Sequence, residues 1–301
     1  MRQLGHRVTV TADYADEPAD TMVAIHAWRS AEAIARFKTR HPKRWLILQL
    51  SGTDIYEHLT KDARPTLRSM ELADRLVALN SLAWRVVPER FRKKLRVIFQ
   101  SAPKPAAPRR PSERSIDVCV IGYLRDVKIP KGRHRQRGCC PPRPEFASFT
   151  SAALTIPNGQ PAATTEMAEN PRYLWREEVP RAAVQKVLLR SHAMVLSSLS
   201  EGGANVISEA VMAGVPILAS RADGNVGLLG TDYPGYCACD TQALARLLQR
   251  IETDRSFVDQ LRRASARLAP LFSPEREVAA WERLLAELSP NADRRLPRGG
   301  A

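Results

Sequence analysis

Short apolar runs alternate with amphipathic helical stretches along most of the chain, and this alternation constrains the fold more than any other feature. The helical stretches of the first part of the chain cover residues 30–39 and 64–71. Strands separated by helices pair in parallel, because each helix carries the chain back across the sheet. The runs that resemble strands cover residues 7–11, 21–25, 45–49, 75–79 and 96–99. The first 102 residues are therefore predicted to form one α/β domain.

A proline-rich segment interrupts this pattern at residues 103–113 and predicts a semi-rigid linker. The alternation then starts again and predicts a second α/β domain over residues 114–288, followed by a polar tail over 289–301. Its predicted strands cover residues 116–121, 193–198 and 215–219. Its predicted helices cover residues 180–191, 204–213, 241–253, 256–268 and 274–288.

Residues 129–166 have neither a helical nor a strand period, over a length that is unusual for a loop inside a compact domain. If third codon positions are G or C, a shifted reading frame turns part of this stretch into an apolar strand that ends in two glycines. We therefore interpret residues 129–166 as aberrant, read between two compensating frameshifts.

The charge balance narrows the choice of partner. The chain has 46 Lys and Arg against 32 Asp and Glu, a net charge of +14, which favours anionic partners. It has neither a run of about 20 apolar residues nor a signal-peptide pattern at Met1, so we predict a cytoplasmic protein with no membrane span. The five cysteines match neither a disulfide framework nor paired zinc ligands. We interpret His134, Cys139 and Cys140 as an ordinary loop, and we expect no metal and no cofactor.

The densest functional signal runs from Ser200 to Ala219, between two predicted strands. Two glycines stand at a strand-to-helix turn, where open backbone amides and the helix dipole favour a phosphate. Glu201 before the helix and Glu209 within it can accept hydrogen bonds from two sets of hydroxyls, which a sugar nucleotide offers. An exposed helix with a glycine-rich entry is the alternative that spacing alone leaves open.

Glu201 and Glu209, followed by Ala-x-x-Ala-Gly-Val-Pro-Ile-Leu-Ala, resemble the donor-site signature of the family-four retaining glycosyltransferases. The resemblance implies a GT-B fold, in which two Rossmann-like domains face each other across a cleft. It implies that Glu201 is catalytic and holds the donor sugar hydroxyls, and that Glu209 holds the ribose. The residues assigned in this way to the nucleotide and its diphosphate are Gly202, Gly203, Ala204, Asn205 and Glu209.

The same family has a basic pair after the first strand of its second domain, and this chain has Arg125 and Lys128 at the corresponding turn. These side chains would neutralise the leaving diphosphate in place of a metal ion. A solvated basic turn is the alternative interpretation.

Several further segments resemble the selenosugar synthase branch of this family. They include residues 24–30, 50–56, 98–103, 169–173 and 221–235. The resemblance implies two small-molecule substrates: a UDP-sugar, expected to be UDP-N-acetylglucosamine, and selenophosphate. The expected product has a carbon–selenium bond at the anomeric centre.

Polar residues at the predicted carboxyl ends of the first domain's strands are expected to face the ligand, because this edge binds ligands in open parallel sheets. His26 is predicted to position or protonate selenophosphate, with a structural hydrogen bond as the alternative. Thr53 and Asp54, after the third predicted strand, are predicted to contact the substrate. Asn225 is predicted to contact the donor sugar, with turn formation as the alternative.

Compared with the family, the chain starts late, so we expect an inner strand of the first domain to be missing and its neighbours' edges to be exposed. Other functions stay open. The chain can be a family-four transferase that moves a hexose to a hydroxyl acceptor, or an inactive truncated or frameshifted relic. The basic run from Arg90 to Arg96 motivates a third alternative, nucleic-acid binding, although no stacking motif accompanies it and we predict no nucleic-acid partner. The oligomeric state is left open.

Overall fold

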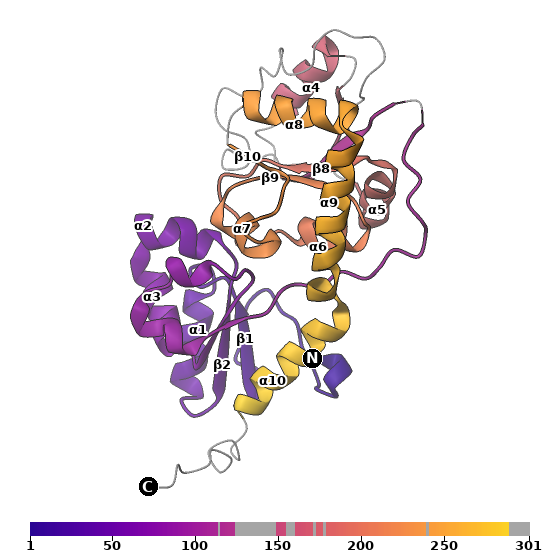
Figure 1. Ribbon diagram of the computed structural model, residues 1–301. Coiled ribbons are helices and arrows are strands. Elements are labelled where there is room, and N and C mark those ends of the chain that lie inside the picture. The colour runs from indigo at the N-terminus through magenta and orange to yellow at the C-terminus, as the bar shows by residue number, and fades with distance from the viewer. Residues whose placement is uncertain are drawn as a thin grey trace, which may run out of the picture. The chain divides into compact units, whose positions relative to one another are not determined.

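The computed structural model describes residues 1–113, 115–123, 149–154, 160–170, 173–176, 179–238 and 241–288 (Figure 1). The chain forms two compact units. The first consists of residues 1–100 and 274–301, and the second of residues 101–273. Each unit contains a parallel β-sheet with helices, so the predicted α/β fold class is confirmed.

The first unit has a four-stranded sheet in the order β1-β2-β3-β4. Its strands are β1 (Thr21–Ile25), β2 (Trp45–Leu50), β3 (Arg75–Ala78) and β4 (Leu95–Val97). Its α-helices are α1 (Ala31–Arg40), α2 (Leu59–Lys61), α3 (Ala63–Leu72) and α10 (Pro274–Glu287). Shorter helical turns are η1 (Arg2–Leu4), the π-helical η2 (Asp54–His58), η3 (Ala83–Arg85) and η4 (Glu89–Lys94).

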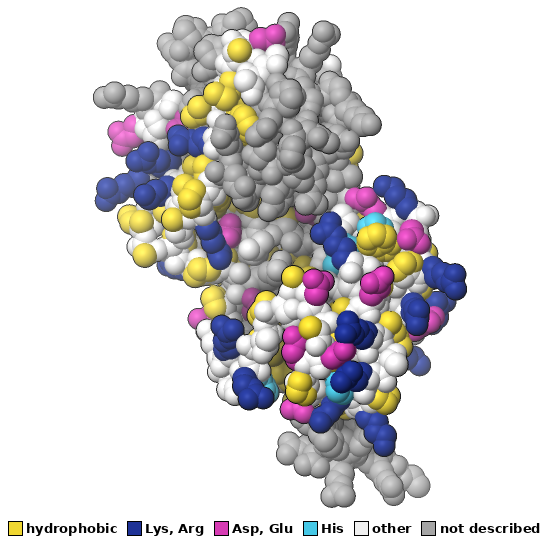
Figure 2. Space-filling view, turned by 180° about the vertical axis from the view of Figure 1, so that it is seen from behind, with side chains coloured by type: hydrophobic (Ala, Val, Ile, Leu, Met, Phe, Trp, Pro, Cys, Tyr) yellow, Lys and Arg dark blue, Asp and Glu magenta, His cyan; other side chains and the backbone are white. Residues whose placement is uncertain are grey.

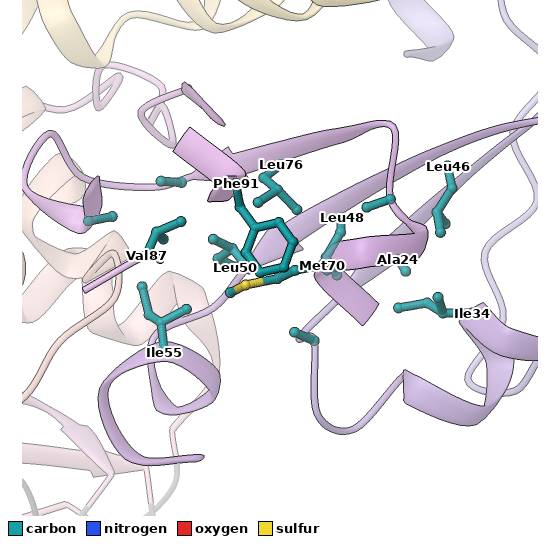
Figure 3. Close-up of a cluster of buried hydrophobic side chains, with 14 of the residues drawn as sticks. Ala24, Ile34, Leu46, Leu48, Leu50, Ile55, Met70, Leu76, Val87 and Phe91 are labelled. Atoms are coloured by element: carbon teal, nitrogen blue, oxygen red, sulfur yellow. The ribbon is translucent and has the colours of Figure 1, made fainter. Parts of the chain in front are cut away.

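The sheet of the first unit buries apolar side chains on both faces. Successive residues of a strand point to opposite faces, so Leu48 joins one buried cluster and Ile47 the other. Figure 3 shows the larger cluster, in which Leu48 lies with Ile34 of α1 and Met70 of α3. Burying one such side chain contributes about 1.5–3 kcal/mol, so this cluster is a major source of the unit's stability.

Helix α10 packs on the first unit, not on the second as the sequence predicted when residues 274–288 were assigned to the second domain. Leu284 and Leu288 join Ile47 of β2 in the smaller buried cluster. Glu287 also forms ion pairs with Arg75 at 3.0 Å and Arg96 at 2.8 Å. The sequence identified the helix but not the surface on which its apolar face is buried.

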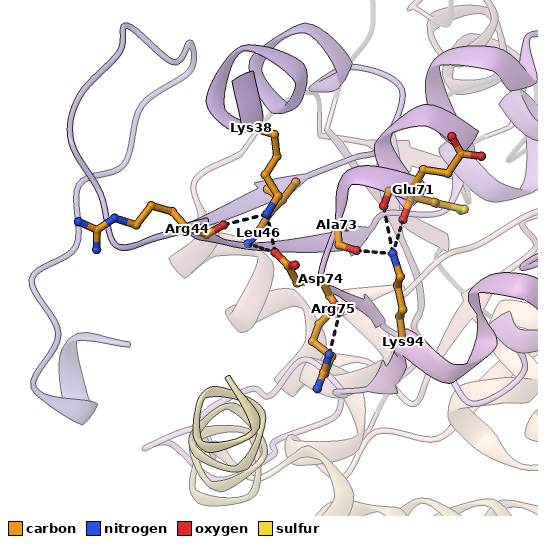
Figure 4. Close-up of polar contacts among 9 residues, drawn as sticks. Lys38, Arg44, Leu46, Glu71, Ala73, Asp74, Arg75 and Lys94 are labelled. Atoms are coloured by element: carbon orange, nitrogen blue, oxygen red, sulfur yellow. Dashed lines mark hydrogen bonds and ion pairs between the residues drawn. The ribbon is translucent and has the colours of Figure 1, made fainter. Parts of the chain in front are cut away.

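The basic run from Arg90 to Arg96 is tied into the first unit by its own contacts. Lys94 donates hydrogen bonds to the carbonyl oxygens of Met70, Glu71 and Ala73 at the end of α3 (Figure 4). Arg90 pairs with Glu71 at 3.2 Å. On the face shown in Figure 2, Lys and Arg side chains lie among Asp and Glu side chains rather than in one continuous band.

The second unit has a six-stranded sheet in the order β10-β9-β8-β5-β6-β7. Its strands are β5 (Val118–Tyr123), β6 (Phe149–Leu154), β7 (Tyr173–Trp175), β8 (Ala193–Leu196), β9 (Ile217–Ser220) and β10 (Tyr236–Cys237). Its helices are α4 (Gln160–Glu169), α5 (Arg181–Arg190), α6 (Asn205–Met212), α7 (Asp223–Leu229), α8 (Thr241–Thr253), α9 (Arg255–Leu268) and the 3-10 turn η6 (Ala269–Phe272). Within the described residues, no helix is both long and apolar enough to span a membrane.

The structure differs from the expected elements in two places, and of these only the predicted strand at residues 7–11 was wrong. The interpretation of residues 129–166 as read out of frame stays a prediction. Residues 7–11 form no strand and are largely exposed, because no neighbouring strand pairs with them. Within the stretch interpreted as aberrant, residues 149–154 form β6 and residues 160–169 form α4. β6 pairs with β5 on one side and β7 on the other, and pairing of this kind outweighs a weak local preference for strand.

The proline-rich segment packs against the second unit. Arg110 donates its backbone N–H to the carbonyl of Leu189, at 2.9 Å. The Arg109 guanidinium donates to the carbonyl of Ser191 at 2.7 Å, and its burial lowers the pKa of Arg109 to about 10. The predicted linker is thus held by backbone and side-chain contacts to the end of α5.

Candidate functional site

The turn between β8 and α6 contains the glutamate that the sequence marked as catalytic. Glu201 is half-buried, and its Oε1 accepts a hydrogen bond from the hydroxyl of Ser198 at 2.6 Å. Ser198 is itself 1% exposed, so the donor is fixed in the interior of the second unit. A short, charge-assisted bond of this kind holds the carboxylate in one orientation.

Helix α6 starts directly after this turn, and no side chain caps its first turn. Ala204 occupies the N-cap position and has no acceptor, and the first turn contains no acidic residue. The turn that leads into it contains Gly202 and Gly203, and Asn205 on its first turn is exposed. Backbone amides at such a helix start attract an anion, so the local structure suits the diphosphate predicted from the sequence.

Glu209 lies in the second half of α6 and already has a cationic partner. Its Oε1 pairs with the Arg181 guanidinium at 3.1 Å, and Arg181 lies at the start of α5. The Glu209 side chain is 21% exposed and that of Arg181 is 71% exposed, so the pair lies at the surface of the unit. Arg181 carries no sequence motif of its own, so no pattern in the sequence pointed to it.

Asn225 has a different environment from the one predicted. Its side chain is fully buried in α7, and its amide donates to the Ser220 carbonyl at 3.1 Å and to the Ser220 hydroxyl at 3.0 Å. A side chain with 0% exposure does not reach a sugar on the surface, so the predicted contact with the donor sugar was wrong in this structure. Its burial favours a structural role close to Glu201.

The predicted basic pair, Arg125 and Lys128, lies outside the described residues, as do His134, Cys139 and Cys140. The two described cysteines, Cys119 and Cys237, are buried free thiols. Within the described part of the chain, no group of three or more His, Cys, Asp and Glu side chains is arranged to hold a metal ion.

In the first unit, His26 and Thr53 are brought together at the carboxyl ends of β1 and β2. His26 Nε2 lies 2.8 Å from the Thr53 hydroxyl oxygen, and His26 Nδ1 accepts the backbone N–H of Arg29 at 3.2 Å. With Nδ1 accepting, the neutral ring carries its proton on Nε2 and donates it to Thr53. Burial lowers the pKa of His26, which favours this neutral form, although nearby Asp54 partly opposes the shift.

Asp54 is fully buried and does not point a free carboxylate at a ligand, so a direct contact between this side chain and the substrate was a wrong prediction. Its oxygens accept the backbone N–H groups of Ala27, Ser51, Gly52 and Ile55, at 2.8–3.1 Å. These bonds tie the turn after β1 to the turn after β2. They also help to hold His26 in its left-handed backbone conformation, with φ of 74°.

An aromatic pair next to His26 escaped the sequence analysis. The rings of Trp28 and His58 stack with centroids 4.4 Å apart, and Trp28 Nε1 donates to Asp62 at 2.8 Å. The His58 ring also meets the His26 ring edge-on, at 5.8 Å between centroids. A tryptophan two residues after His26 has no distinctive spacing, so only the fold reveals this cluster.

Among the comparisons with known proteins, the family match covers the part of the second unit that contains Glu201 and α6. Residues 164–268 match the family model described as "Glycosyl transferases group 1". A curated relative, "Glycosyltransferase 1 domain-containing protein 1" from Xenopus tropicalis, is 36% identical over 78 residues. That alignment covers 26% of this chain and 23% of the relative, so the chain spans under a quarter of the relative's length.

Solved structures share the fold at low sequence identity. Sucrose-phosphate synthase from Thermosynechococcus elongatus has a TM-score of 0.72 and 15% identity, over 89% of this chain and 73% of that protein. HepE from Anabaena, solved in complex with UDP and glucose, has a TM-score of 0.69 and 17% identity, over 89% and 77%. The chain therefore has the GT-B fold of these structures, and residues 164–268 within it match the glycosyltransferase family model.

Proposed function

We propose that the chain transfers a sugar from a UDP-sugar, and that the acceptor is selenophosphate. The observation that carries the first part is the turn from Ser198 to Ala204, which combines a fixed carboxylate with a helix start that no side chain caps. This turn lies inside the segment that matches the glycosyltransferase family model. HepE, which has the same fold, was solved with UDP and glucose.

In this proposal the donor is held by groups along α6. The backbone N–H groups at the helix start, from Gly202 to Asn205, donate hydrogen bonds to the diphosphate oxygens, and Glu209 accepts hydrogen bonds from the ribose hydroxyls. Glu201 accepts hydrogen bonds from the hydroxyls of the transferred sugar. Arg125 and Lys128 neutralise the charge that develops on the leaving diphosphate.

The first unit supplies the acceptor site in this proposal. The selenium atom of selenophosphate forms a bond to the anomeric carbon as the bond from that carbon to the diphosphate oxygen breaks. UDP leaves with the electron pair of the broken bond. His26 donates its Nε2 proton to Thr53, so the Thr53 hydroxyl proton is oriented away from His26 and is available to an oxygen of selenophosphate.

Product analysis separates this proposal from its alternatives. The protein is incubated with UDP-N-acetylglucosamine and either selenophosphate or simple alcohols and sugars, and products are followed by mass spectrometry and by release of UDP. We expect a selenium-containing sugar with selenophosphate, and a drop of at least about 100-fold in rate for Glu201→Gln. A matched control is Glu282→Gln, which removes an exposed carboxylate on α10.

Other results have distinct meanings. Transfer to alcohols or sugars with no reaction of selenophosphate would contradict the acceptor and support a hydroxyl-directed transferase. Failure to release UDP with any acceptor would contradict the activity and support an inactive relic. Salt-sensitive binding to random DNA with no response to UDP would support the nucleic-acid alternative.

A further inference from the structure

Three buried polar residues connect helix α7 to the Glu201 carboxylate through a continuous series of hydrogen bonds. The Asn225 amide donates to the Ser220 hydroxyl oxygen at 3.0 Å. The Ser220 hydroxyl then donates to the backbone carbonyl of Ser198, and the Ser198 hydroxyl donates to Glu201 Oε1 at 2.6 Å. The series joins the end of β9 to the loop that follows the neighbouring strand, β8.

The direction of each bond in this series is fixed by the donors and acceptors available. The Ser220 oxygen accepts the Asn225 N–H, so its own proton points to the Ser198 carbonyl. All three side chains are at most 1% exposed, so water does not compete for these bonds. Hydrogen bonds in a buried series polarise and strengthen one another.

Close packing of backbone against backbone reinforces the connection. A Cβ atom added at Gly224 would lie 1.7 Å from the backbone oxygen of Glu201 and 2.5 Å from its carbonyl carbon. Only a glycine allows the first turn of α7 to approach Glu201 so closely. The position of this turn and the position of the Glu201 backbone are therefore not independent.

Tyr236 fixes the far end of the same helix. Its hydroxyl donates to the carbonyl oxygen of Gly230 at 2.7 Å and lies 3.4 Å from that of Asn225. Burial raises the pKa of Tyr236, which keeps the hydroxyl protonated and able to donate. Helix α7 is thus held both by β10 and by its contact with Glu201.

We propose that Asn225, Ser220 and Ser198 are positioning residues that orient the Glu201 carboxylate toward the donor sugar. We call this set the Glu201 relay. The expected effect of these residues on kcat rests on the proposed function. Their expected effect on the position of Glu201 does not. Asn225 and Ser220 act through Ser198, so neither needs to touch a ligand.

The substitution Ser220→Ala tests the relay with the smallest change in volume. We expect it to lower kcat for UDP-sugar turnover about ten- to a hundredfold, because a displacement of about 1 Å in an active site can cost about 100-fold. The dissociation constant for UDP, measured by calorimetry, is expected to change less than about twofold, since UDP lacks the sugar that Glu201 holds. Gly224→Ala, which pushes α7 away from Glu201, is expected to act in the same direction.

The matched control is Ser265→Ala, which removes another fully buried hydroxyl from the same unit. Ser265 lies 3.2 Å from the Tyr233 hydroxyl and takes no part in the Glu201 relay. We expect this control to keep wild-type kcat even if it lowers stability. In a double-mutant cycle, Ser198→Ala with Ser220→Ala is expected to lose little more kcat than Ser198→Ala alone, because both act through one contact.

Hydrogen exchange provides a readout that does not depend on activity. Amides of residues 197–204 are expected to exchange faster in Ser220→Ala and in Gly224→Ala than in the wild-type chain or in Ser265→Ala. Unchanged exchange of this segment, or unchanged kcat in a chain that turns over UDP-sugar, would overturn the relay. Absence of UDP binding in the wild-type chain would instead contradict the proposed function, while exchange would still decide whether the relay exists.

Discussion

The Asp54 carboxylate stabilises the first unit by accepting backbone N–H groups from two turns. Asp54→Asn keeps the size of the side chain, but it removes the charge and turns an N–H₂ group toward amides that only donate. We expect the unfolding free energy to fall by about 2–3 kcal/mol, the scale of hydrogen bonds to a charged group. Urea denaturation of this variant against Asp13→Asn, an exposed control, checks the effect. Equal stability of the two variants would contradict the role given to Asp54.

A buried histidine, His26, and a half-buried one, His192, make stability depend on pH. His26 and His192 each use Nδ1 to accept a backbone N–H, and burial lowers the pKa of both below the ordinary value of 6.5. The unfolded chain therefore binds protons first, and stability is lost as pH falls from about 6.5 through the lower native pKa values. Stability above about pH 7 is expected to be independent of these two groups.

Urea denaturation at about pH 7.5 and about pH 5.5 measures this dependence. His192→Gln is expected to reduce the loss of stability between the two conditions, whereas His6→Gln, at an exposed position, is expected to leave it unchanged. A wild-type chain that is more stable at about pH 5.5 than at about pH 7.5 would contradict the predicted loss of stability at low pH.

At the residue scale, sequence patterns pointed to the turns after β1, β2 and β8, but they did not show how every side chain in these turns is used in the structure. Glu201, Glu209 and His26 stand in patterns that have a chemical meaning. Ser198 and Ser220 belong to no such pattern. A serine at a strand end can make many different hydrogen bonds, and only the packing around it decides which one forms. Asn225 and Asp54 were given ligand contacts because polar residues at strand ends face ligands in this class of fold. In the structure, Asn225 and Asp54 are buried against neighbouring turns and hold these turns in place.

Lys94 stabilises the end of helix α3. Its ammonium group donates to three carbonyl oxygens that have no helical partner, and cations favour the negative end of a helix dipole. Lys94→Met keeps most of the aliphatic stem and is expected to lower the unfolding free energy by about 1–2 kcal/mol. Lys93→Met, at the exposed neighbouring position, is the control and is expected to change it by less than about 0.5 kcal/mol. Similar losses in both variants would contradict the capping role.

At the element scale, apolar runs bounded by turns predicted β1, β2 and β3 almost to the residue. The same pattern predicted a strand at residues 7–11, but these residues pair with no other strand in the structure. It did not predict β6, whose small residues give a weak pattern, although β6 pairs with a strand on each side. Strand pairing joins distant parts of the chain, so a short stretch of sequence does not show whether another strand will pair with it. Helices were easier because their hydrogen bonds lie within the segment.

Helix α10 connects the end of the described chain to the first unit, and the stability of that unit depends on it. Leu284 is 2% exposed and lies in the cluster that covers one face of the sheet. We expect Leu284→Ala to lower the stability of the first unit by about 2–5 kcal/mol, through lost burial and a cavity. The control Leu285→Ala, at a half-buried position, is expected to cost less. Hydrogen exchange of β2 and β3 in the two variants locates the loss, and an effect confined to the second unit would contradict the packing.

At the scale of the whole molecule, the alternation of strands and helices predicted two α/β units and the break between them. It did not predict that the chain returns to the first unit after residue 273, because an amphipathic helix shows which of its faces is apolar but not what covers that face. The proposed function comes from the resemblance of the segment around Glu201 to a donor site and from the family match over residues 164–268, whereas the comparisons with solved structures support the fold.

Calorimetric titration with UDP shows whether the turn before α6 and the helix itself bind a nucleotide. We expect UDP to bind the wild-type chain and Glu282→Gln equally, and to bind Glu209→Gln at least about tenfold more weakly because the ribose hydroxyls lose a charged acceptor. Equal affinity for UDP in Glu209→Gln and the wild-type chain, or no binding to either, would contradict a nucleotide-sugar site on α6.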